Sequence, residues 1–150
     1  MNEVVAVLLA LAVCLHANAA HAADKSAHDR QIAAGHATYE RACAACHGAN
    51  GEGVAHWEEP DANGEMPAPP HDASGHTWKH SDAMLYHIVQ QGWRDPFNKT
   101  QRLTMPSFKG ELSREETIAV IDYLKTLWKP EQRQFQAEES RKQPFPSKPQ

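Results

Sequence analysis

The sequence predicts an all-α chain of three main helices joined by long loops. Apolar residues recur at three- and four-residue steps in 24–45, 81–91 and 113–128, the spacing of one helix face. The stretches between them, 48–79 and 93–110, hold most of the glycines and prolines and show no such period. A chain of 150 residues with 41% hydrophobic side chains suits one domain with a small core.

The first helix is predicted over 24–45, with Ile32, Gly35, Tyr39 and Ala42 on one face. A glycine inside a helix costs stability, so Gly35 indicates that another segment packs closely against this face. A simple break at this point, with the helix starting later, is the alternative.

Residues 43–47 read Cys-Ala-Ala-Cys-His, the C-x-x-C-H pattern of covalent c-type haem attachment. Cys43 and Cys46 can each form a thioether to a haem vinyl group, and His47 can then ligate the iron. A thioredoxin-like pair would need a βαβ context, and no strand is predicted before Cys43. Half of a zinc site would need a second ligand pair, and Cys14 lies in a segment that we expect to be removed. The sequence therefore predicts one haem.

Residues 1–22 have features of a secretory signal peptide. The twelve-residue apolar run Val4–Leu15 is short for a bilayer span, and A-x-A patterns end at Ala19 and Ala22. The first three residues lack the usual positive charge. We expect cleavage after Ala22 and a periplasmic or otherwise exported protein without stable membrane insertion. An uncleaved membrane anchor is the alternative.

The charge balance argues against nucleic acid as a partner. The chain carries 15 Lys and Arg residues against 19 Asp and Glu residues, a formal net charge of −4. Export agrees with the haem motif, because the thioethers are normally made outside the cytoplasm.

The second helix is predicted over 81–91, with Ser81 as its N-cap and Gly92 just past its end. Leu85, Ile88 and Val89 would form its buried stripe, with Met84 beside it.

The last helix, 113–128, opens with a Ser-Arg-Glu-Glu capping box at Ser113, and Pro130 ends it. We expect one domain over 23–130, followed by a loosely held or disordered Pro/Gln-rich tail over 131–150. Phe135 and Phe145 are the residues expected to pin parts of this tail to the surface.

The second axial ligand of the iron is sought among the methionines and histidines. Met105 lies in a loop just before the last helix and is stiffened by Pro106, so it is the favoured candidate. Met84 lies beside an apolar stripe and suits the core. Met66 and the histidines remain as alternatives.

These features together resemble the class I cytochromes c, over about residues 28–129. The matching features are Gly35 and Tyr39 before the motif, the motif at 43–47, Met105-Pro106 after a long loop, and Asp122-Tyr123-Leu124 in the final helix. The stretch 67–78 also looks like a group of bacterial monohaem cytochromes.

The resemblance implies a class I cytochrome c fold, with three main helices and long loops around one covalently bound haem. The first and last helices would cross near Gly35, and Tyr39 matches an aromatic that packs there. Pro69 or Pro70 would lie near His47 and accept or orient its second hydrogen bond, a contact that tunes ligand basicity. Tyr39 and the two prolines are thus expected at the haem site.

We therefore expect a one-electron carrier and not an enzyme. Ligation by His47 and Met105 would keep the iron from binding substrate, and outer-sphere transfer would use the exposed haem edge near the thioethers. Its partners would be redox proteins of unknown identity, since no docking ring of lysines is evident. A haem enzyme or gas sensor with a labile distal ligand is one alternative. A haem subunit of an oxidase or dehydrogenase, anchored by Val4–Leu15, is the other.

The long loop is also rich in histidine. His71, His76 and His80 cluster there, with His56 and His87 nearby. Imidazoles at this density can bind copper or zinc. The favoured interpretation is a solvated loop, because no acidic or cysteine ligand joins them at tight spacing.

Overall fold

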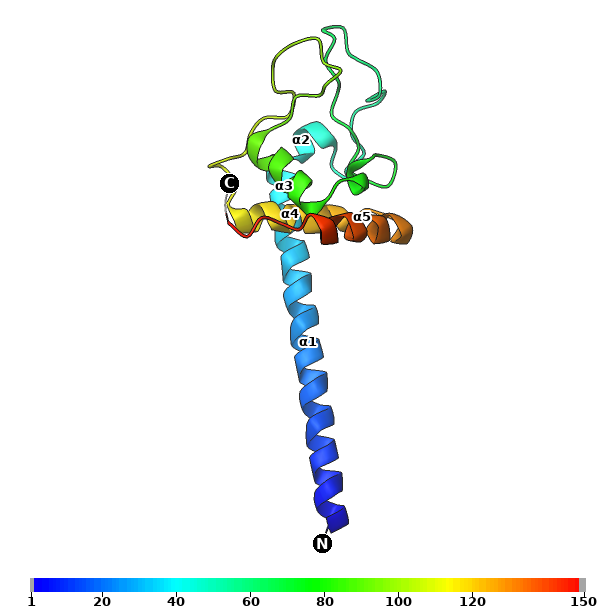
Figure 1. Cartoon of the computed structure of the whole chain (residues 1–150), viewed down its shortest axis with the longest axis vertical. Helices are drawn as coiled ribbons and strands as arrows, with labels where there is room; N and C mark the ends of the chain where they lie inside the picture. The colour runs from blue at the N-terminus through cyan, green and yellow to red at the C-terminus, as the bar shows by residue number, and fades with distance from the viewer. Residues whose placement is uncertain (1, 149–150) are drawn as a thin grey trace. The chain divides into compact units, whose positions relative to one another are not determined.

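The computed structural model describes residues 2–148, with side chains from Ala22 onward. Its helices are α1 (Asn2–Ala42), α2 (Ala44–His47), the 3-10 turn η1 (Thr77–Lys79), α3 (Asp82–Gln91), α4 (Arg114–Thr126) and α5 (Pro130–Lys142) (Figure 1). Residues 2–148 contain no strand, only two isolated β-bridges. The all-α prediction is confirmed.

The chain divides into two compact units, Met1–Gln31 and Ile32–Gln150. The expected signal peptide lies in the first unit, and its side chains before Ala22 are outside the described residues. Within the described part of the chain, no helix is long and apolar enough to cross a membrane. Cleavage after Ala22 stays a prediction.

Gly35 lies where α1 crosses α4. A Cβ at this position would lie 2.0 Å from the carbonyl oxygen of Ala119 and 2.9 Å from the Cβ of Tyr123. Tyr39, one turn later, is fully buried, and its ring centroid lies 5.4 Å from that of Tyr123. The close crossing inferred from Gly35 is therefore confirmed, and the alternative of a helix break is wrong.

The core lies where α1, α3 and α4 meet. Its buried members are Tyr39, Leu85, Tyr86, Val120, Ile121, Leu124 and Trp128. In the stripe predicted for α3, Leu85 is buried, whereas Ile88 and Val89 are only half-buried. Tyr86 is fully buried, although the apolar pattern of this helix did not predict it as a core residue.

The predicted caps of α3 and α4 are confirmed. Ser81 accepts a hydrogen bond from the backbone N–H of Met84, and Gly92 follows the helix with φ 76°. Ser113 and Glu116 form a reciprocal capping box at the start of α4.

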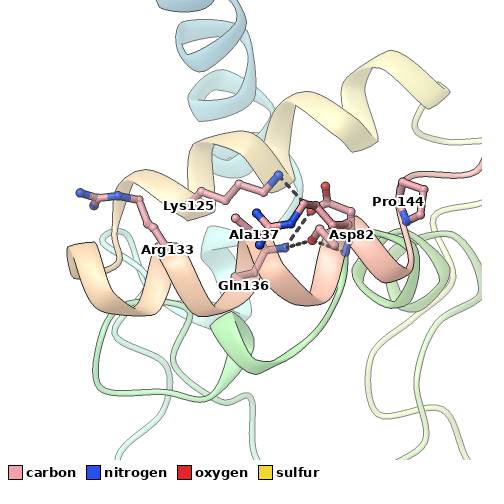
Figure 2. A pocket seen from close by; sticks show the side chains of 8 residues that line it. Asp82, Lys125, Arg133, Gln136, Ala137 and Pro144 are labelled. Carbon is pink, nitrogen blue, oxygen red and sulfur yellow. Dashed lines mark hydrogen bonds and ion pairs between the residues drawn. The ribbon is translucent and has the colours of Figure 1, made fainter.

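The prediction of a loosely held tail is wrong for 131–142, which belongs to α5 (Pro130–Lys142). This helix packs against η1 and α3 (Figure 1). Its anchor is Gln136, which is 2% exposed and donates hydrogen bonds of 2.8 Å to Asp82 Oδ1 and Ser140 Oγ. Figure 2 shows the Asp82 carboxylate between Gln136 and Lys125, whose Nζ lies 2.9 Å from Asp82 Oδ1. The polar composition concealed α5 because hydrogen bonds of its polar side chains contribute much of its attachment.

Two aromatic side chains hold this C-terminal segment, as predicted. The ring of Phe135 meets Trp78 edge-on at 5.6 Å between centroids. Phe145 is half-buried against the core and lies under the Lys125 ammonium.

Candidate haem site

The C-x-x-C-H motif forms a helical turn of its own. α1 ends at Ala42, short of the predicted Ala45, and the backbone N–H groups of Cys46 and His47 both donate to the carbonyl of Cys43, at 3.1 and 3.0 Å. Residues three and four apart share one face of a helical turn. The two thiols and the imidazole are therefore presented on the same side.

The two thiols are free, with Cys46 exposed and Cys43 half-buried. Burial and the neighbouring Cys46 raise the pKa of the Cys43 thiol to about 11. Dithiol exchange uses the thiolate, so this raised pKa disfavours exchange at Cys43. Among the described residues, no group of three or more His, Cys, Asp or Glu side chains is arranged to hold a metal ion. The zinc and dithiol interpretations gain no support.

His47 is 7% exposed and oriented by one hydrogen bond. Its Nδ1 lies 2.9 Å from the carbonyl oxygen of Pro69. Burial lowers the pKa of His47, and this hydrogen bond partly offsets the effect. The ring is thus neutral with a proton on Nδ1, which leaves the Nε2 lone pair for a metal ion.

Pro69 and Pro70 have different partners. Pro69 meets His47, whereas the carbonyl of Pro70 accepts a hydrogen bond of 3.3 Å from Thr77 Oγ1. The chain reaches this arrangement through Gly53, whose φ is 68° and whose N–H donates to the carbonyl of His47 at 2.7 Å. A Cβ at Gly53 would lie 2.5 Å from the nitrogen of Pro70, so only glycine allows this approach.

A second imidazole lies beside the first. The rings of His71 and His47 stack with centroids 3.9 Å apart and planes inclined by 26°. Burial, then the positive charges that His47 and His76 can carry, holds the pKa of His71 well below its usual range. Sequence reasoning placed His71 only in a His-rich loop. Its position directly after Pro69-Pro70 was the available signal.

The other loop histidines contact aromatic rings. His76 stacks on Trp57 at 5.3 Å, and His80 meets His76 edge-on at 5.4 Å between centroids. Burial lowers the pKa of both His76 and His80. The prediction of a simply solvated loop is therefore wrong for these two rings, which pack against neighbouring rings.

Met105 is held through its backbone to the C-terminal end of α3. It forms an isolated antiparallel bridge with Trp93, with N···O distances of 3.0 and 3.1 Å, and its side chain is half-buried. Ser107 adds a hydrogen bond of 2.6 Å from Oγ to the carbonyl of Gln90. Met66 and Met84, the other methionines considered, are also half-buried.

A scan against protein families found one match, to the cytochrome c family, over residues 32–128. The chain belongs to the cytochrome c family. No curated protein and no solved structure gave a match. This cytochrome c domain binds one haem c covalently and carries electrons between redox partners. Helix α5 begins after the matched range.

The residues of this cytochrome c domain fit a covalently bound haem. The reduced thiols of Cys43 and Cys46 share one face with an imidazole whose Nδ1 is occupied and whose Nε2 is not. Thioether formation consumes a thiol, and axial ligation requires a neutral imidazole.

Proposed function

We propose that this cytochrome c is a one-electron carrier in which His47 and Met105 are the axial ligands of the haem iron. Cys43 and Cys46 form the thioethers. The observation that carries this proposal is the hydrogen bond between His47 Nδ1 and Pro69. That bond is the outer contact by which proteins orient a ligating histidine and raise its basicity.

Met105 suits the distal position because its backbone is fixed while its thioether remains half-buried. The bridge to Trp93 and the hydrogen bond from Ser107 to Gln90 hold the loop on both sides of Pro106. A thioether ligand raises the potential of a haem relative to a second histidine. Ligation on both faces also leaves no position for a substrate, which favours electron transfer over catalysis.

Bound haem supplies the one-electron chemistry of iron, and the protein holds the proposed axial ligands in fixed positions. His47 keeps one tautomer through Pro69, and the Met105 loop keeps its place on α3, so little has to move when the charge changes. We propose that electrons enter and leave by outer-sphere transfer on the side of the thioethers, where Cys46 is exposed.

We also propose that the mature protein begins after Ala22 and is exported to the periplasm. The haem motif supports export, and members of this family typically lie on the extracellular or periplasmic side. Mass spectrometry of the purified holoprotein would give the mature N-terminus, and a retained Met1 would refute cleavage.

An optical and redox titration of the holoprotein tests the proposed ligands. Ferric haem with a thioether ligand has a weak absorption band at the red end of the spectrum. We expect this band in the wild type and in the control Met66→Ala, and its loss in Met105→Ala. A band that persists in Met105→Ala, or that is missing from the wild type, would refute the assignment of Met105.

A further inference from the structure

We propose that His71 is a positioning residue that fixes the ring plane of the proximal ligand His47. This inference rests on the proposed function, in which His47 ligates the iron. Its basis is the stack of the two imidazoles, with centroids 3.9 Å apart and planes inclined by 26°.

A hydrogen-bonded chain fixes the orientation of the His71 ring. Thr77 Oγ1 donates its proton to the carbonyl of Pro70 at 3.3 Å. The hydroxyl must then accept from His71 Nδ1, which lies 2.8 Å away, so the proton of the neutral ring sits on Nδ1. The His47 ring is thus hydrogen-bonded to the carbonyl of Pro69. The His71 ring is linked through Thr77 to the carbonyl of Pro70.

The backbone of His71 is held as firmly as its ring. Its N–H donates to the carbonyl of Gly51 at 2.7 Å, and its own carbonyl accepts from the Trp128 indole at 2.8 Å. The ring edge also faces Tyr39, with centroids 6.5 Å apart. His71 is thus tied to the haem-motif loop, to the segment after α4 and to α1.

The rigid His71 ring restricts a motion of His47 that the hydrogen bond to Pro69 alone does not restrict. A single hydrogen bond leaves a ring free to rock about the line that joins its donor and acceptor. A flat neighbour at stacking distance removes that freedom, because any tilt would close the gap on one side. His71 thereby keeps the His47 plane the same in both oxidation states of the haem.

A purely structural role would favour a different side chain. An aliphatic residue would fill the same space without the cost of burying a second polar ring. The imidazole of His71 has a flat face that packs on His47 and an edge that is hydrogen-bonded to Thr77, and both properties help to orient the His47 ring.

The test measures the orientation of the axial imidazole directly. In the ferric holoprotein, the proton NMR shifts of the haem methyl groups depend on the plane of that imidazole. We expect His71→Leu to change the order or spacing of these resonances. Thr77→Val keeps the His71 ring but removes the hydroxyl that anchors it and that donates to Pro70, and it should change the resonances in the same direction. His71→Phe, which keeps a flat face, should fall between wild type and His71→Leu.

Electron self-exchange provides a second measurement. We expect His71→Leu to exchange electrons more slowly than the wild type, because a His47 ring that is free to tilt must reorganise at each change of oxidation state. The control is His87→Leu, which replaces an exposed histidine on α3 and should keep the wild-type resonances and rate.

The outcomes separate this inference from the proposed function. Wild-type methyl resonances in His71→Leu, or an equal change in His87→Leu, would overturn the role of His71 while leaving His47 as the ligand. A wild-type spectrum without His47 ligation would instead refute the proposed function. If His71→Leu fails to accumulate with haem, Thr77→Val carries the test, and an unchanged pattern in that variant overturns the inference.

Discussion

Gly35 shows how the absence of one side chain determines the distance between two helices. Its Cα approaches the backbone of Ala119 so closely that even a methyl group would overlap the carbonyl oxygen. In an isolated helix the same methyl would be favourable, by about 1 kcal/mol. The sign of the change in unfolding free energy on replacing Gly35 by alanine therefore tells whether the crossing with α4 persists in solution.

We expect Gly35→Ala to destabilise the protein by about 2 kcal/mol, because the helices must separate to admit the methyl group. Urea unfolding of the holoprotein measures this change. Ala37→Ser, at an exposed position of the same helix, should change the free energy of unfolding by no more than about 0.5 kcal/mol. Increased stability in Gly35→Ala would contradict the close crossing.

Residues whose role depends on near neighbours were predictable from the sequence. The motif at 43–47, the glycine at 35 and the cap at Ser113 each follow from local spacing or conformational rules. His71 was not predictable in this way. Its stacking on His47 exists only because the loop folds back through Gly53, and no short-range rule pairs residues that lie so far apart.

Among the elements, α5 differs most from the sequence prediction. Three side chains after α4 donate to carbonyls of the loop before α3: Trp128 to His71, Gln132 to Ala73 and Gln136 to His80. Hydropathy does not detect such contacts, because it scores Gln as a solvent-facing residue. Helix α5 therefore binds the loop before α3 through hydrogen bonds of its glutamine side chains. Its composition nevertheless resembles that of a disordered tail.

We expect Gln136→Ala to cost about 2 kcal/mol, because it removes two buried hydrogen bonds, one of them to the Asp82 carboxylate. The free energy of unfolding by urea is again the measurement. Gln134→Ala, an exposed neighbour on α5, serves as the control and should have little effect. Equal effects of the two substitutions would show that α5 is not docked through Gln136.

At the scale of the whole molecule, the buried loop histidines make stability depend on pH. The folded-state pKa values of His76 and His80 are lowered by burial, and their values in the unfolded chain are near 6.5. Above that pH the two imidazoles are neutral in both the folded and the unfolded state, and their protonation does not reduce the free energy of unfolding. As the pH falls below it, the unfolded chain binds protons that the folded chain does not, and stability is lost until the pH passes the folded values.

We therefore expect the holoprotein to lose stability as the pH falls from about 7 to about 5, where histidines of unfolded chains take up protons. Urea unfolding at several pH values measures the slope. In the double variant His76→Gln, His80→Gln the slope should be shallower over this interval. A slope equal to that of the wild type would refute burial of these two rings in solution.

The position of α5 after the haem motif also sets the order in which these two parts are synthesised. A polypeptide is made from its N-terminus, so residues 43–47 emerge well before residues 130–142. Until those last residues arrive, the carbonyls of Ala73 and His80 lack the glutamine donors that α5 supplies. The loop 48–76 and the segment up to His80 therefore receive these two hydrogen bonds only after α5 has been made.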